Sequence, residues 1–163
     1  MLTTVDYYTD GACSPNPGKG GWAWIRIENG VVTGQEGGME ANSTNQVMEL
    51  TAAYNACADA FARGYFSSFS TYIVNIHTDS AYVYNCWYQE WWRAWQSNGW
   101  KNSKKELVAN RELWEKIVPF FKKLNVTFFK VAGHCGDPYN EMVDNLAVWY
   151  RKDCKGFRGD CPC

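Results

Sequence analysis

Runs of alternating apolar and polar residues open the chain and predict strands. The first run, Thr3–Thr9, is rich in residues that favour strands and leads into Asp10-Gly11, which is typical of a turn. Two further runs, Trp22–Glu28 and Val31–Gly38, are separated by Asn29-Gly30, a strong signal for a tight hairpin. The start of the chain therefore predicts three antiparallel strands.

The remaining residues alternate between helical and extended patterns. Helices are indicated by apolar residues at helical spacing and by polar residues that can cap the first turn. They are expected at 45–63, 80–95, 111–124 and 141–152. Strands are expected at Tyr72–Thr78 and Val126–Val131, and the Gly- and Pro-containing segments 13–21 and 133–138 are expected to be loops. Because a strand–helix–strand crossover favours parallel pairing, the order predicts an α/β fold with a five-stranded mixed sheet flanked by helices.

The length of 163 residues fits one domain. We expect that domain to span residues 1–152 and to be followed by a flexible tail, 153–163, that contains Cys154, Cys161 and Cys163. The tail could be a metal knuckle with a missing ligand, but a closed zinc site needs four ligands, so a reduced tail is favoured. The seven cysteines are scattered and odd in number, which does not indicate a disulfide framework.

Composition excludes several classes of protein. Charged residues make up 20% of the chain and hydrophobic residues 46%, so intrinsic disorder is not expected. No stretch approaches the roughly 20 apolar residues of a membrane-spanning helix, and the first residues carry no secretory signal. The sequence predicts a soluble, cytoplasmic monomer with no membrane partner.

The net charge of −1 conceals an uneven distribution. Residues 1–90 contain three basic and nine acidic residues, whereas residues 91–130 contain nine basic and three acidic residues. Such asymmetry indicates a polyanionic partner or a cation site, although ordinary scatter of surface charge would also produce it. Aromatic residues reach 17% of the chain, more than a small core needs, which suggests that some line a surface that contacts a flat partner.

Four carboxylates are expected near the ends of predicted elements: Asp10, Glu49, Asp79 and Asp144. Adjacent strand ends in an open α/β sheet form the usual ligand crevice, so these side chains could converge there. Clustered carboxylates are costly unless cations bind them, and oxygen ligands suit Mg²⁺ or Mn²⁺. Each residue alone could equally be solvated or cap a helix, as Asp79 could do before Ser80.

The residues around these carboxylates form four ordered blocks: YYTDGACSPNPGKGGW, STNQVMELTAAYNA, IHTDSAYVYN and VAGHCGDPYNEMVDNLA. Together they resemble the type 1 ribonuclease H family over about Val5 to Ala147. The resemblance implies a ribonuclease H-like fold and an endoribonuclease that hydrolyses the RNA strand of RNA–DNA hybrids. The segment WWRAWQSNGWKNSKK also resembles the basic handle protrusion of some members.

The resemblance also implies roles for particular residues. The family's metal-binding carboxylates match Asp10, Glu49, Asp79 and Asp144, and its mobile-loop histidine matches His134. Two Mg²⁺ ions, with Mn²⁺ as a substitute, would bridge the scissile phosphate, activate a water and stabilise the leaving 3′-oxygen. The products would carry 5′-phosphate and 3′-hydroxyl ends, and the histidine would assist proton transfer or product release.

Contacts with an RNA–DNA hybrid are implied in the same way. The family's minor-groove contacts match Cys13, Asn16, Asn45 and Gln46. Amide side chains can both donate to and accept from 2′-hydroxyls and base edges. Turn and cap chemistry would explain the two asparagines equally well. A grip on a DNA phosphate is assigned to Asn16 and Thr44.

The DNA strand is assigned to the handle region. Trp91 and Trp114 match aromatic positions of the family's DNA-strand channel, whereas Trp95 and Trp100 are expected to form a local core. Charge attraction to the DNA backbone is assigned to Arg93, Lys101, Lys104 and Lys105. One departure is Ala81, which stands where bacterial relatives often carry a glutamine that contacts the minor groove. A DNA-processing nuclease and a hybrid-binding module without catalysis are the competing functions.

Overall fold

A five-stranded mixed sheet is the middle layer of the protein, in the order β3-β2-β1-β4-β5. The computed structural model describes residues 2–123, 125–133 and 136–152. The strands span Thr3–Cys13 (β1), Gly18–Glu28 (β2), Val31–Ser43 (β3), Tyr72–Thr78 (β4) and Val126–Lys130 (β5). Pairing is antiparallel between β1, β2 and β3 and parallel between β1, β4 and β5. The predicted α/β fold class is confirmed.

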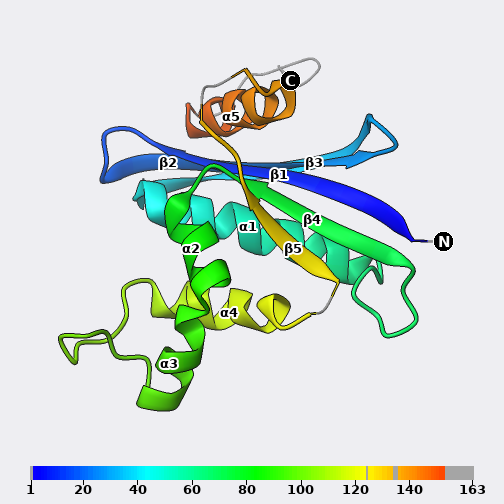
Figure 1. Ribbon diagram of the computed structural model, residues 1–163. Coiled ribbons are helices and arrows are strands. Elements are labelled where there is room, and N and C mark those ends of the chain that lie inside the picture. Colours follow the sequence, from blue (N-terminus) through cyan, green and yellow to red (C-terminus); the bar gives the residue numbers. More distant parts are fainter. Residues whose placement is uncertain (1, 124, 134–135, 153–163) are drawn as a thin grey trace.

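Helices cover both faces of the sheet (Figure 1). They span Asn45–Ala62 (α1), Ala81–Gln89 (α2), Trp91–Asn98 (α3), Arg111–Phe121 (α4) and Pro138–Arg151 (α5). Helix α5 packs on β1, β2 and β3 from one side, and α1 packs on the other side with α4 beyond it. Within the described part of the chain, no helix is both long and apolar enough to cross a membrane.

The first strand is longer than the sequence predicted, and the turn expected at Asp10-Gly11 is wrong. Pairing of β1 with β2 continues through both residues as far as Cys13, opposite Gly20. Glycine is needed at position 11 for another reason: a Cβ there would lie 2.5 Å from the backbone nitrogen of Glu49. The Asp-Gly pair therefore marks a close approach between β1 and α1, and the predicted loop 13–21 shortens to the four residues between β1 and β2.

The single helix predicted for 80–95 is also wrong. The chain forms α2 and α3, and Glu90 between them adopts a left-handed conformation with φ of 55°. The Glu90 N–H donates to the carbonyl of Cys86, which closes α2. The sequence has no glycine or proline at Glu90 that would predict the break between α2 and α3. The change of direction allows Trp92, at 5% exposure, to join the main core.

The middle position of α1 explains its composition. Ala52, Ala53, Ala56 and Ala60 are all fully buried, because the helix lies between the sheet and α4. Small side chains allow close approach on two sides, while the larger Met48 and Leu50 fill the space near the helix start. On the opposite face, Val143, Leu146 and Ala147 of α5 pack against Ala23, Ile25 and Ile27 of β2.

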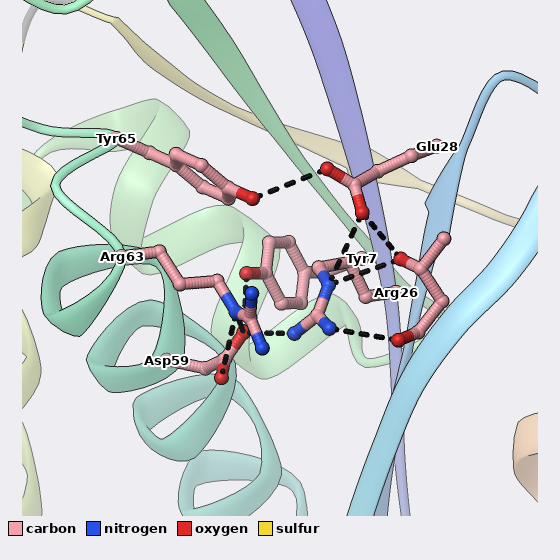
Figure 2. Close-up of polar contacts among 7 residues, drawn as sticks. Tyr7, Arg26, Glu28, Asp59, Arg63 and Tyr65 are labelled. Atoms are coloured by element: carbon pink, nitrogen blue, oxygen red, sulfur yellow. Dashed lines mark hydrogen bonds and ion pairs between the residues drawn. The ribbon is translucent and has the colours of Figure 1, made fainter.

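A buried polar network joins the far end of α1 to the sheet (Figure 2). Arg26 of β2, only 3% exposed, pairs with Asp59 of α1 at 2.6 Å, and the Tyr7 hydroxyl donates to the same carboxylate oxygen at 2.6 Å. Arg63 also pairs with Asp59, at 3.2 Å. Burial and the bond to Asp59 raise the pKa of Tyr7, so the phenol stays protonated. The network fixes the α1 C-terminal turns against β1 and β2.

Removing the shared acceptor tests this network. Asp59→Ala leaves a buried guanidinium and a buried phenol without their partner, so we expect a loss of about 3 kcal/mol in the free energy of unfolding. The matched control is Arg111→Ala, which breaks the exposed Arg111–Glu115 pair of 2.7 Å and should cost about 0.5 kcal/mol or less. Urea denaturation of both variants gives the comparison, and equal losses would contradict a special contribution from the buried network.

Candidate active site

Two aspartates lie next to each other at the point where β1 and β4 stop pairing. The parallel pairing of these strands ends at Thr9 and Thr78, and the next residues are Asp10 and Asp79. Asp10 remains fixed on its other side, opposite Ala23 of β2. Because the two strands are in register, both carboxylates reach the same end of the sheet, as the sequence predicted.

Helices α1 and α5 supply the other two carboxylates. The Thr44 hydroxyl caps α1 by accepting from the Val47 N–H at 3.1 Å, and the close contact at Gly11 sets Glu49 beside β1. Oxygens of Asp10, Glu49 and Asp79 lie within 4.8 Å of one another. On α5, Asp144 lies beside Asp10, whose pKa it raises, and lines the same cleft. The structure thus brings together all four carboxylates named from the sequence.

The cluster carries strong mutual repulsion. Asp10 is only 4% exposed, and burial followed by the charge of Asp79 raises its pKa. Burial also raises the pKa of Glu49, against the opposing effect of a hydrogen bond with Ser80. Lys130, at the end of β5, lowers the Glu49 pKa through its charge. Carboxyl groups held in this way favour either a proton or a cation.

The donor set fits a hard divalent cation. The four carboxylates line an open cleft of about 390 Å³ with Asn45, Gln46, Ser80 and Tyr82. Every candidate ligand is an oxygen, which suits Mg²⁺ or Mn²⁺ rather than a thiophilic metal. No ion pair joins Asp10, Glu49 or Asp79 to a basic side chain among the residues described. A bound cation would therefore relieve the repulsion directly.

The residues assigned to the RNA strand gather beside this cleft. The Cys13 N–H donates to Asn45 Oδ1 at 2.8 Å, and the Asn45 N–H donates to Asn16 Oδ1 at 3.2 Å. Thr44 precedes Asn45 as the helix cap, and the exposed Gln46 follows it. The asparagines therefore have the turn and cap roles that were the alternative to substrate binding. The same hydrogen bonds also hold their side chains in place at the edge of the carboxylate cleft.

The residues assigned to the DNA strand are divided between surface and core. Lys101, Lys104 and Lys105 are exposed on the segment 99–110, which projects away from the sheet with α3 (Figure 1). Arg93 is also exposed, with its guanidinium bonded to Glu90 at 2.8 and 3.2 Å.

Trp114 differs from its expected surface position. It has 0% exposure, so it does not line a surface channel in this structure. Its ring instead packs against Trp95 at 5.6 Å between centroids, and Trp95 packs against Trp100 at 5.9 Å. Trp91 is half-buried and contacts Trp95 at 6.2 Å. Trp95 and Trp100 form the local core that the sequence predicted, and Trp114 belongs to the same cluster.

Some expectations fall outside the described residues, namely His134 and the tail with Cys154, Cys161 and Cys163. The preceding Gly133 does lie close to the cleft, since a Cβ there would be 3.3 Å from Asp79 Oδ2. The chain's other histidine, His77, bonds Asp6 at 2.8 Å and stacks on Tyr8.

Sequence reasoning missed Ser80 and Tyr82 as parts of the cleft. Ser80 caps α2 by accepting from the Val83 N–H at 3.1 Å and also hydrogen-bonds Glu49. Its position directly after Asp79 could have indicated that it lines the cleft. No local feature of the sequence indicated that Tyr82 does so.

Comparisons with known proteins agree with this geometry. The RNase H family model matches residues 3–151. The chain is 44% identical to ribonuclease H of Syntrophomonas wolfei, over 90% of this chain and 94% of that protein. It is 38% identical to ribonuclease H of Treponema pallidum, over 95% of each chain.

Solved structures share the fold. LC9-RNase H1, a type 1 RNase H with the type 2 active-site motif, is similar with a TM-score of 0.75 and 23% identity, over 93% of this chain and 74% of that one. LC11-RNase H1 in complex with RNA/DNA hybrid gives a TM-score of 0.70 and 18% identity, over 92% and 98% of the two chains. With the relatives above, the fold and its carboxylate cleft define a nuclease. The chain belongs to the ribonuclease H family.

Repulsion between the clustered carboxylates should lower the free energy of unfolding by a measurable amount. Because the folded-state pKa of Asp10 is raised, the folded protein holds a proton that the unfolded chain releases near pH 4. In chelator, stability should therefore fall as pH rises above about 4. Asp10→Asn removes the group that must take up this proton on folding, so we expect it to add about 2 kcal/mol to the free energy of unfolding at pH 7.5 and to flatten the pH dependence.

Denaturant unfolding from pH 5 to 8 in EDTA checks this expectation. The control variant is Glu106→Gln, which neutralises an exposed carboxylate away from the cleft and should leave the pH profile as in the wild type. A variant Asp10→Asn that is less stable than the wild type in chelator would show that the cluster is not under electrostatic strain.

Proposed function

We propose that this chain is a metal-dependent endoribonuclease that hydrolyses the RNA strand of RNA–DNA hybrids. The observation that carries the proposal is the convergence of Asp10, Glu49 and Asp79 within 4.8 Å, with Asp144 lining the same cleft. Hybrid as the substrate is supported by similarity to relatives named ribonuclease H and to LC11-RNase H1, which was solved with RNA/DNA hybrid. Four converging carboxylates would be a disadvantage in a module that only binds a polyanion.

The four carboxylates would hold two divalent cations, Mg²⁺ or Mn²⁺. When bound, such a pair supplies a nucleophilic water and stabilises the charge that develops on the leaving oxygen. The chain's own residues set the geometry: Asp10 is fixed by the pairing of β1 with β2, and Ser80 holds the Glu49 carboxylate by a hydrogen bond. Hydrolysis would leave a 5′-phosphate and a 3′-hydroxyl. His134 is assigned to proton transfer or product release from its match to the family's loop histidine.

Recognition of the RNA strand is assigned to the ordered groups beside the cleft. Because Asn45 Oδ1 accepts from the Cys13 N–H, the Asn45 amide offers its NH₂ group as a donor. Gln46 is exposed next to it and can both donate and accept. A hybrid displays 2′-hydroxyls in its minor groove on the RNA strand alone, so such groups can distinguish it from duplex DNA. This favours a ribonuclease over a DNA-processing nuclease.

The DNA strand is assigned to the projecting region. Lys101, Lys104 and Lys105 are exposed there, with Arg93 on α3, and would attract the DNA backbone. Trp91 is half-buried and can present one edge to a sugar or base. Trp114 would act indirectly by supporting this surface from the core.

A cleavage assay tests the proposal. With Mg²⁺, the protein should cut the RNA strand of a labelled RNA–DNA hybrid and leave duplex DNA intact, and chelator should stop the reaction because the carboxylates need cations. Asp10→Asn should abolish turnover while circular dichroism shows a retained fold. Cleavage of duplex DNA alone, or of hybrid in excess EDTA, would contradict the proposal.

The projecting lysines should contribute to affinity through charge alone. Lys101→Ala removes one phosphate contact, so it should weaken hybrid binding to a similar extent for every sequence and reduce the slope of log K against log salt by about 1. Fluorescence anisotropy between 50 and 200 mM salt, with Ca²⁺ or chelator in place of Mg²⁺, measures this. Lys152→Ala is the matched control, because that exposed lysine follows α5 on the other face of the sheet. Equal slopes for Lys101→Ala and the wild type would remove Lys101 from the interface.

A further inference from the structure

The hydroxyl of Tyr82 lies between three groups of the α4 region. It accepts from Trp114 Nε1 at 2.8 Å and from Asn110 Nδ2 at 3.4 Å, and it donates to the carbonyl of Ala109 at 3.5 Å. The first bond is short and the other two are long. A phenol has one donor and two acceptor sites, so these partners use its full capacity.

Each partner depends on this hydroxyl. Trp114 is fully buried, so its indole N–H would lose its only hydrogen bond among the described residues if the hydroxyl were removed. The two rings also pack edge to face, with centroids 5.2 Å apart and planes at 71°. Asn110 is the residue before α4, in a left-handed conformation, and its side chain makes no cap hydrogen bond. Its amide instead bonds Tyr82, which ties the start of α4 to α2.

Tyr82 also belongs to the cleft. It is the second residue of α2, three positions after Asp79, and it lines the cleft that contains the carboxylates. Asn110 ends the projecting segment 99–110, and Trp114 packs on Trp95 of α3. One phenol therefore touches the cleft wall, the end of the projecting segment and the aromatic cluster beneath α3.

We propose that Tyr82 is a positioning residue that fixes the projecting segment and α3 relative to the carboxylate cleft. This inference rests on the proposed function, in which the projecting region binds the DNA strand while the cluster cuts the RNA strand. The distance between those two surfaces must match the width of one hybrid duplex. The Tyr82 hydroxyl sets that distance, because it is bonded to the α4 start and the core tryptophan at once.

The substitution Tyr82→Phe tests the proposal, because it removes the hydroxyl and keeps the ring. We expect KM for hybrid to rise about three- to tenfold as the projecting segment shifts, while kcat stays within about twofold, because the carboxylates remain in place. Tyr88→Phe is the matched control: Tyr88 lies on the same helix, is 66% exposed and stacks on Tyr84. No hydrogen bond of its hydroxyl is found in the described parts of the chain, so its KM should match the wild type.

A second measurement is independent of activity. In the wild type, the Trp114 indole N–H should exchange slowly with solvent, and in Tyr82→Phe it should exchange at least about tenfold faster, as measured by NMR. If Tyr82→Phe does not fold, Asn110→Gly replaces it, because glycine tolerates the left-handed conformation and lacks the amide. That variant should also raise KM, by a smaller factor, because the Trp114–Tyr82 bond remains, and an unchanged KM would overturn the positioning role.

The outcomes separate the two proposals. A folded Tyr82→Phe protein with wild-type KM and wild-type indole exchange would overturn the positioning role. A fall in kcat without a change in KM would also overturn it, since the hydroxyl would then act on the chemical step. If the wild type itself leaves hybrid uncut, the proposed function fails, while the indole exchange still reports on the Tyr82 contacts.

Discussion

Carboxylates that repel one another are held within a few ångströms by the packing of α1 against β1. Gly11 makes this packing possible, because any Cβ at that position would occupy the space of the α1 backbone at Glu49. Asp10 and Asp79 are fixed by strand register, so α1 is the element whose position completes the cluster. The cleft, the cation binding proposed for it and its candidate substrate contacts all depend on that single interface between a helix and a strand.

Charge is handled in opposite ways at the two ends of α1. Near its C-terminus, the Asp59 carboxylate has two arginines and a phenol as partners, and the resulting network is satisfied internally (Figure 2). Near its N-terminus, Glu49 faces further carboxylates, and among the described residues its ionised form is favoured by Ser80 and by the more distant charge of Lys130. A helix anchored firmly at one end can hold an unfavourable group at the other, which is how local strain at a functional site is commonly sustained.

The sequence predicted most of the fold and the carboxylate set, because strand periodicity, the Asn29-Gly30 hairpin and helix caps are local signals. It failed where tertiary packing decides the conformation. Asp10-Gly11 has the composition of a turn, but glycine is present because a helix approaches. The break at Glu90 has no glycine or proline to announce it and follows from the burial of Trp92. Trp114 could be assigned to a surface or to the core only once α3 and α4 were placed.

The order of the layers determines which parts of the protein can unfold locally. Helix α1 is enclosed by the sheet on one side and α4 on the other, so we expect the amide hydrogens of its buried middle turns to exchange only when the main core separates. The projecting segment 99–110 has mostly exposed side chains and can open alone at lower free energy. We therefore expect native-state fluctuations to be largest in the region assigned to holding the substrate, and the carboxylates to belong to the unit that opens last. Local opening of the segment would leave the carboxylate cleft intact.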